Sequence, residues 1–216
     1  MPALLPVPEP DYYALLGLLP AATQEEITAC LWERLREVHP DLYPSPENRA
    51  AFDLLLKARA TLTDPEKRQR YHIQQAFAPL HNRYCLHQSK LSIVQRHVQY
   101  WQGEVYLLDG SDVFDRTAFK LRAYQDWPNM GNYRDPSTSW EMLRDVLTDS
   151  LHERSGLVVL VWTEAQNMLL RGLDDLLTAH TVLRDVVVSV NQNQETLVNA
   201  HFLLIGTGHN FPKSLG

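Results

Sequence analysis

Apolar residues in the first third of the chain recur every three or four positions, which is the spacing of one helix face. The clearest run is Ile27, Leu31 and Leu35, which follows Thr23 and Glu26 in the T-x-x-E spacing of a capping box. The pattern predicts two antiparallel helices with a smaller helix at each end, an all-α unit of four helices. The predicted helices cover residues 11–17, 24–38, 48–62 and 66–71.

The pattern changes after residue 103, where short apolar runs alternate with amphipathic segments. The continuous apolar run 157–162 is typical of a strand that is covered on both faces. The order strand, helix, helix, strand, helix, strand predicts a small α/β domain with a mostly parallel, three-stranded sheet. The predicted strands are 104–108, 157–162 and 202–205, and the predicted helices are 114–121, 140–148 and 173–190.

The stretch between these two patterns is polar and ambiguous. Residues 91–101 fit a helix through Val94, Val98 and Trp101, but they also fit an extra strand. We therefore expect a multi-domain chain with a helical domain at 1–75, a linker at 76–102 and an α/β domain at 103–216.

Composition narrows the class of protein. The net charge is -6, and residues 93–216 hold 10 basic and 15 acidic side chains, which disfavours direct nucleic-acid binding and favours a basic or neutral protein partner. We find no nucleophile motif, no phosphate-binding glycine loop and no zinc-type spacing around Cys30 and Cys85. We expect no enzyme, cofactor or metal, no membrane span and no leader segment, and hence a cytoplasmic protein.

The tripeptide His39-Pro40-Asp41 ends the second predicted helix. Proline fixes its own φ and disfavours the α region for the preceding residue, so Asp41 is expected on a stiff corner. A stiff exposed corner favours a binding role over a chemical one. The alternative is a turn that does nothing except stop the helix.

These residues resemble the J-domain of DnaJ-like co-chaperones over residues 11–72. The resemblance implies that His39-Pro40-Asp41 engages a DnaK-type chaperone and stimulates its ATP hydrolysis, with Lys67 and Arg68 holding the fourth helix. Arg34 and Arg36 are the basic residues that remain near the corner. The motifs are Asp11-Tyr12-Tyr13, Leu16-Gly17, Glu26-Ile27, the tripeptide, Phe52, Ala58, Leu62, Asp64-Pro65-Glu66-Lys67-Arg68 and Tyr71.

The chain departs from this family on the exposed face of its second helix. J-domains usually carry basic residues there and a lysine after the aspartate. We therefore expect weak or unusually selective chaperone binding. The residues found in those places are Thr28, Ala29, Trp32, Glu33 and Leu42.

The second half resembles barstar, a protein inhibitor of a ribonuclease, from about residue 103 to 206. The similarity lies in the order of elements, the loop that begins at Trp127 and contains Met130, and the helix that starts at Trp140. It implies that Glu141 and Asp145 face a basic partner such as a ribonuclease toxin. Arg144 departs from the family, and residues 133–135 lengthen the loop. The partner-binding residues are then Glu141, Asp145, Trp127, Met130 and Arg144.

Two alternatives remain open for the second half. Carboxylates four residues apart also occur on ordinary solvated helix faces, where Arg144 softens their repulsion. In the second alternative, the α/β domain is a client or partner adaptor without nuclease inhibition. In both cases the chain is expected to be a two-domain interaction protein.

Overall fold

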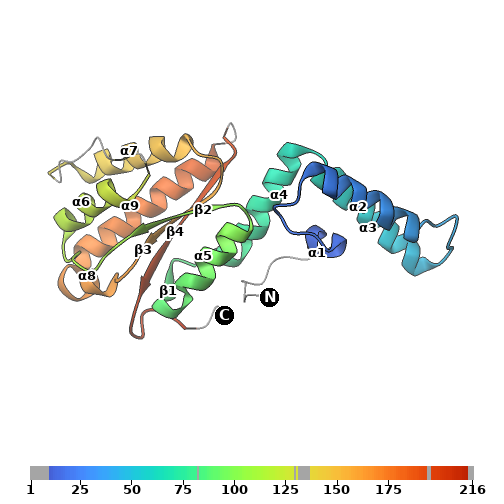
Figure 1. The fold of residues 1–216 in the computed structure, drawn as a ribbon. Coiled ribbons are helices and arrows are strands. Elements are labelled where there is room, and N and C mark those ends of the chain that lie inside the picture. The colour runs from blue at the N-terminus through green and yellow to red at the C-terminus, as the bar shows by residue number, and fades with distance from the viewer. Residues whose placement is uncertain (1–9, 82, 129, 131–136, 194–195, 214–216) are drawn as a thin grey trace.

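The computed structural model describes residues 10–81, 83–128, 130, 137–193 and 196–213. A helical hairpin projects from a layered α/β body, and its closed end is the part of the molecule farthest from the sheet (Figure 1). The hairpin consists of α2 (Gln24–Glu37) and α3 (Pro46–Leu62). Between the hairpin and the body lie α1 (Tyr12–Leu16) and α4 (Pro65–Phe77).

Local capping explains where these four helices begin and end. The capping box of Thr23 and Glu26 is formed in full, and Asp64 caps α4 directly before Pro65. Gly17 ends α1 with φ of 71°, a left-handed conformation that glycine adopts without steric cost. The four predicted helices are confirmed, although α4 continues to Phe77 and so extends into the expected linker.

The described sheet has four parallel strands in the order β1-β4-β3-β2. The predicted strands correspond to β2 (Glu104–Leu108), β3 (Gly156–Trp162) and β4 (Val198–Gly206). The prediction of three strands is wrong because β1 (Cys85–His87) pairs with β4 at the edge. β1 has three residues and only Leu86 is buried, so it carries no readable periodicity.

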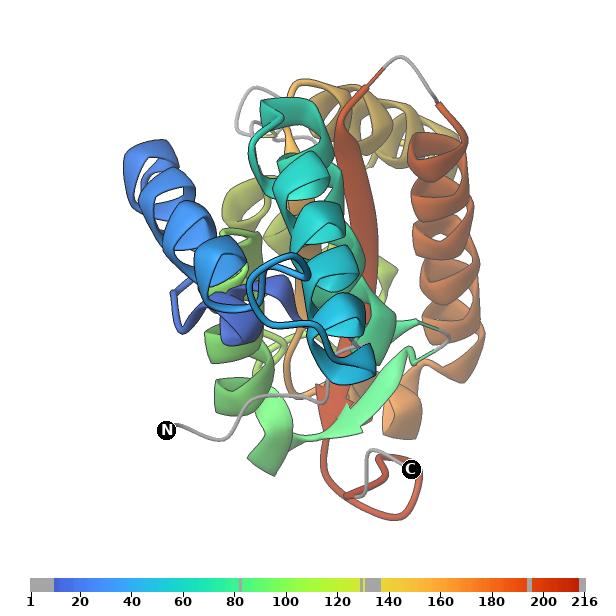
Figure 2. The same cartoon turned by 90° about the vertical axis from the view of Figure 1, so that its right-hand side faces the viewer.

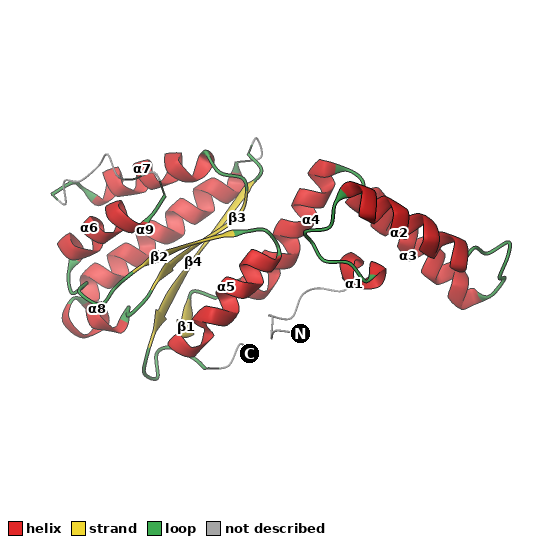
Figure 3. Ribbon diagram, in the orientation of Figure 1, coloured by secondary structure: helices red, strands yellow, loops and turns green. Residues whose placement is uncertain are grey.

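The helices of the body form a layer on each side of the sheet (Figures 2 and 3). One face is covered by α4 and α5, and the opposite face by α6, α7 and α9. The segment 91–101, ambiguous in sequence, forms helix α5, and the short helix α8 was not predicted. The bounds are α5 (Leu91–Tyr100), α6 (Arg116–Asp126), α7 (Trp140–His152), α8 (Gln166–Arg171) and α9 (Leu173–Gln192), with 3-10 turns at Ala78–Leu80 and Gln88–Lys90.

Alternate residues of the central strand face two different cores. Val158 and Leu160 point toward α6, α7 and α9, whereas Val159 and Val161 join the core that contains the helical domain. That second core runs without interruption from α1 to the sheet. Residues 76–102, expected as a linker, hold β1 and α5 and contribute to it. The domain boundaries at 75 and 103 stay a prediction.

In the described part of the chain, no helix is both long enough and apolar enough to cross a bilayer.

Candidate functional site: the corner of the helical hairpin

The corner between α2 and α3 is fixed by its own backbone. The carbonyl of His39 accepts hydrogen bonds from the amides of Leu42, at 3.0 Å, and Tyr43, at 2.9 Å. The side-chain amide of Asn48 donates to the carbonyl of Tyr43 at 2.9 Å, and Ser45 caps α3. Hydrogen bonds therefore tie both ends of the loop, which lies at the tip of the hairpin (Figure 1).

The side chains of the tripeptide are differently exposed. The His39 side chain is 40% exposed and meets the ring of Phe52 edge-on, at a centroid distance of 5.3 Å. With the imidazole proton on Nε2, its Nδ1 accepts a hydrogen bond from the Asp41 amide at 3.3 Å. The Asp41 side chain is 89% exposed. Its Oδ2 lies 4.0 Å from Nδ1 of His39, so the arrangement offers a partner a half-exposed imidazole and an adjacent exposed carboxylate.

The two predicted arginines lie on the last turn of α2. Arg34 is paired with Glu37 at 3.3 Å, in an exposed pair of low energetic value. Arg36 is exposed and forms no ion pair with any described residue. The positive charge next to the tripeptide therefore comes mainly from Arg36.

The other end of the hairpin is joined to the body by buried polar and aromatic groups. Arg68 donates from Nε to the Tyr13 hydroxyl at 2.6 Å, and from Nη2 to the carbonyls of Pro20 and Ala22. The Tyr13 hydroxyl lies 2.7 Å from Nε2 of His72. Burial, together with the nearby Arg68 charge, lowers the pKa of His72 to about 4, so the imidazole is neutral, and with its proton on Nδ1 the Nε2 atom accepts a hydrogen bond from the Tyr13 hydroxyl.

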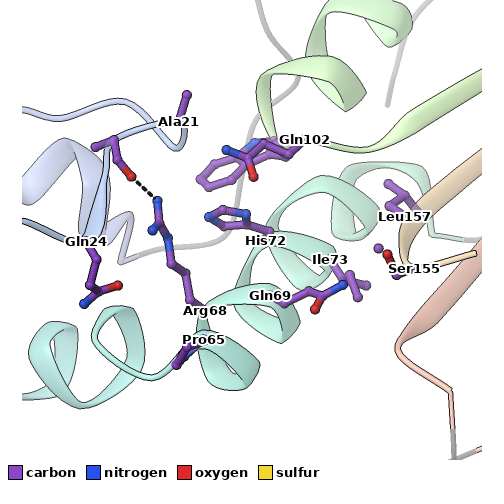
Figure 4. Close-up of a pocket in the computed structure, with 13 residues that line it drawn as sticks. Ala21, Gln24, Pro65, Arg68, Gln69, His72, Ile73, Gln102, Ser155 and Leu157 are labelled. Atoms are coloured by element: carbon purple, nitrogen blue, oxygen red, sulfur yellow. Dashed lines mark hydrogen bonds between the residues drawn. The ribbon is translucent and has the colours of Figure 1, made fainter.

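Trp101 completes this joint. Its indole is 2% exposed and lies about 6.0 Å, between ring centroids, from each of Tyr13, Tyr71 and His72. The next residue, Gln102, has φ of 61° and donates to the carbonyl of Pro20 at 3.0 Å. A cleft of about 610 Å³ opens beside these groups, with Arg68 and His72 pointing into it from α4 (Figure 4).

The sequence identified only some of the residues that join the hairpin to the body. Lys67 forms an exposed pair with Asp64 at 3.4 Å, whereas Arg68 makes the contacts that hold α4. Trp101 and His72 were not singled out. Trp101 ends an apolar series with Val94 and Val98, and this series was the one available signal.

The residues predicted to bind a second partner do not all lie at the surface. Glu141, Arg144 and Asp145 are exposed on α7, where Arg144 pairs with Asp145 at 3.0 Å. Trp127 and Met130 are 3% and 0% exposed and belong to the core between the sheet and its covering helices. Both therefore act in packing rather than in a partner surface. The predicted loop lengthening at 133–135 lies outside the described residues.

A third carboxylate continues the exposed row on α7. Asp149 follows Asp145 by four residues, and Asp185 of α9 borders the same groove of about 420 Å³. Hydrogen bonds from its own amide and from Ser139, helped by the charge of Arg144, hold the pKa of Glu141 below its usual value. Among the described residues, no group of three or more His, Cys, Asp or Glu side chains could hold a metal ion.

Comparison with known proteins places the hairpin in a family. The model of the DnaJ domain matches residues 11–72. The chain is 48% identical over 61 residues to "Chaperone protein DnaJ 2" of Thermus thermophilus, covering 28% of this chain and 22% of that protein. It is 41% identical over 61 residues to "Chaperone protein DnaJ" of Haloarcula marismortui, covering 28% of this chain and 16% of that protein. The match thus spans about a fifth of the length of these relatives, and residues 11–72 form a DnaJ domain, or J-domain.

Proposed function

We propose that this chain is a J-domain co-chaperone that recruits a DnaK-type chaperone and stimulates its ATP hydrolysis. The observation that supports this most is the tripeptide His39-Pro40-Asp41, held on a hydrogen-bonded corner of the DnaJ domain at residues 11–72, with its carboxylate exposed. In this proposal the chaperone carries out the hydrolysis, and this chain carries out no chemical step.

The test is steady-state ATP turnover by a purified DnaK-type chaperone with the full chain. Stimulation is expected with the wild type and is expected to disappear with His39→Gln and with Asp41→Asn. His209→Gln is the matched control, because His209 is exposed and lies far along the chain from the corner. Absence of stimulation by the wild type overturns the proposal.

We further propose that the exposed face of α7 binds a cationic protein, as the barstar resemblance implies for a ribonuclease. The support is the order β2, α6, α7, β3, α8, α9, β4 in a parallel sheet, with Glu141, Asp145 and Asp149 in one exposed row. Residues four apart lie on one side of a helix, so this row concentrates negative charge. The pairing of Arg144 with Asp145 at 3.0 Å lowers that charge, and Glu141 and Asp145 remain the residues that the resemblance assigns to the partner contact.

The competing assignment for the α/β body is a client or partner adaptor that inhibits no nuclease. Affinity capture with the full chain separates the two, using the double variant Glu141→Ala/Asp145→Ala and Asp174→Ala as the control on a different helix. Capture of a basic ribonuclease, lost only in the double variant and accompanied by inhibition of its activity, supports the inhibitor. Capture of a protein that the double variant retains supports the adaptor.

A further inference from the structure

Three large apolar side chains are exposed on the hairpin near the tripeptide. Trp32 is 51% exposed on α2, and Leu42 and Tyr43 are 63% and 55% exposed directly after Asp41. Two of the three, Trp32 and Leu42, occupy positions where the resemblance to J-domains leads one to expect cations. Single exposed apolar residues are common, but a group of them beside a binding corner needs a reason.

Trp32 has a contact that favours one position of its side chain. The guanidinium of Arg59, from α3, lies over the indole at 4.7 Å from the ring centroid. A side chain held in this way loses little rotamer freedom on binding, which is a property of the aromatic residues that contribute most to protein interfaces. The Trp32 indole is therefore suited to be a binding contact.

The net charge of α2 disfavours electrostatic binding to an acidic partner surface. The helix carries four glutamates and two arginines, a net charge of -2, so it does not attract an acidic surface as a lysine-rich helix would. Two cations border Trp32: Arg59 of α3, which lies over the indole, and Arg36, which shares a helix face with Trp32 because residues four apart do so. The partner surface that fits this hairpin is apolar, with at most a local carboxylate near the corner.

The apolar group and the tripeptide can be covered by one partner. His39 follows Trp32 by seven positions, and α2 runs to Glu37, so the two residues are roughly 10 Å apart along the helix axis. Leu42 follows Asp41 immediately in sequence. A surface that reaches the tripeptide and extends two turns along α2 therefore covers all of them.

We infer that Trp32 and Leu42 determine which chaperone this J-domain binds, by docking against a DnaK-type chaperone whose facing surface is apolar rather than acidic. The inference rests on the proposed co-chaperone function and adds the chemistry of the partner. Recognition depends on apolar contact at these two positions, and the tripeptide supplies the stimulation.

The test measures how much full chain half-saturates the stimulation of the DnaK-type chaperone from the organism that encodes it. Trp32→Ala and Leu42→Ala are each expected to raise this concentration at least about fivefold, the loss typical of an important interface residue. Leu19→Ala is the matched control, since Leu19 is 58% exposed but lies before α2 at the opposite end of the hairpin. Circular dichroism confirms that each variant is folded.

The double variant Trp32→Lys/Leu42→Lys gives the sharpest outcome. Binding through apolar contact is expected to weaken about tenfold or more when two cations are introduced, whereas an acidic partner surface would bind the double variant more tightly. Tighter binding, or alanine variants that behave like Leu19→Ala while His39→Gln still abolishes stimulation, overturns this inference and leaves the co-chaperone function standing. No stimulation by the wild type overturns both.

Discussion

Replacing Trp101 with alanine tests whether the J-domain and the α/β body share one core. The indole is 2% exposed and is surrounded by rings from α1, α4 and α5, with Tyr100 at 5.3 Å in addition to the three rings of the joint. Its Nε1 has no hydrogen-bond partner among the described residues, so the substitution removes packing and no hydrogen bond.

The expected loss follows from that packing. Truncation of a buried tryptophan costs about 3 to 5 kcal/mol. A domain has a total stability of about 5 to 15 kcal/mol, so this loss is a large share of it. We expect Trp101→Ala to lower the free energy of unfolding by about 3 kcal/mol or more in urea titrations followed by far-UV circular dichroism.

Trp32→Ala is the control for this prediction. The two substitutions remove the same side chain, but Trp32 is 51% exposed and keeps mainly its contact with Arg59. A loss below about 1 kcal/mol is expected there, as for most surface substitutions away from special features. If Trp101→Ala costs no more than Trp32→Ala, the shared core does not hold the two parts together.

Three further outcomes are expected in the same unfolding assay. Arg68→Ala costs about 2 kcal/mol or more, because the Tyr13 hydroxyl and the Ala22 carbonyl lose a charged donor, whereas Arg70→Ala, on the exposed side of α4, costs less than about 0.5 kcal/mol; equal losses contradict the assigned role of Arg68. Gly17→Ala costs about 1 kcal/mol, since φ is 71° and no atom crowds the position; a neutral effect contradicts the left-handed cap. Stability falls as the pH drops from about 6.5 to about 4, because burial lowers the pKa of His72 and of His201 to about 4, so in that window these two side chains take up protons only in the unfolded chain; each histidine contributes up to about 1.4 kcal/mol per pH unit, and a flat profile contradicts it.

Much of the helical half was predictable because its signals are local. The capping box at Thr23, the proline after Asp64 and the glycine at position 17 each fix a helix end through neighbouring residues. The tripeptide was identified for the same reason, since Pro40 restricts its own neighbours. The three long strands were found because their apolar runs are continuous.

The remaining features depend on contacts between distant residues. β1 exists because Cys85–His87 pairs with β4, more than a hundred residues away, and its own composition does not require a strand. Burial of Trp127 and Met130 likewise depends on the sheet and helices around them. The sequence alone therefore did not distinguish a loop that packs into the core from a loop that binds a partner. Trp101 was visible as one apolar position, but its three partners come from α1 and α4.

The most direct test of the central proposal is a single-turnover measurement of ATP hydrolysis by a DnaK-type chaperone loaded with ATP. We predict that the rate rises with increasing full chain until it saturates, and that the same concentrations of His39→Gln leave it at the rate of the chaperone alone. An unchanged rate with the wild type, or an equal rise with His39→Gln, would contradict the assignment of the His39-Pro40-Asp41 corner as the chaperone-stimulating site.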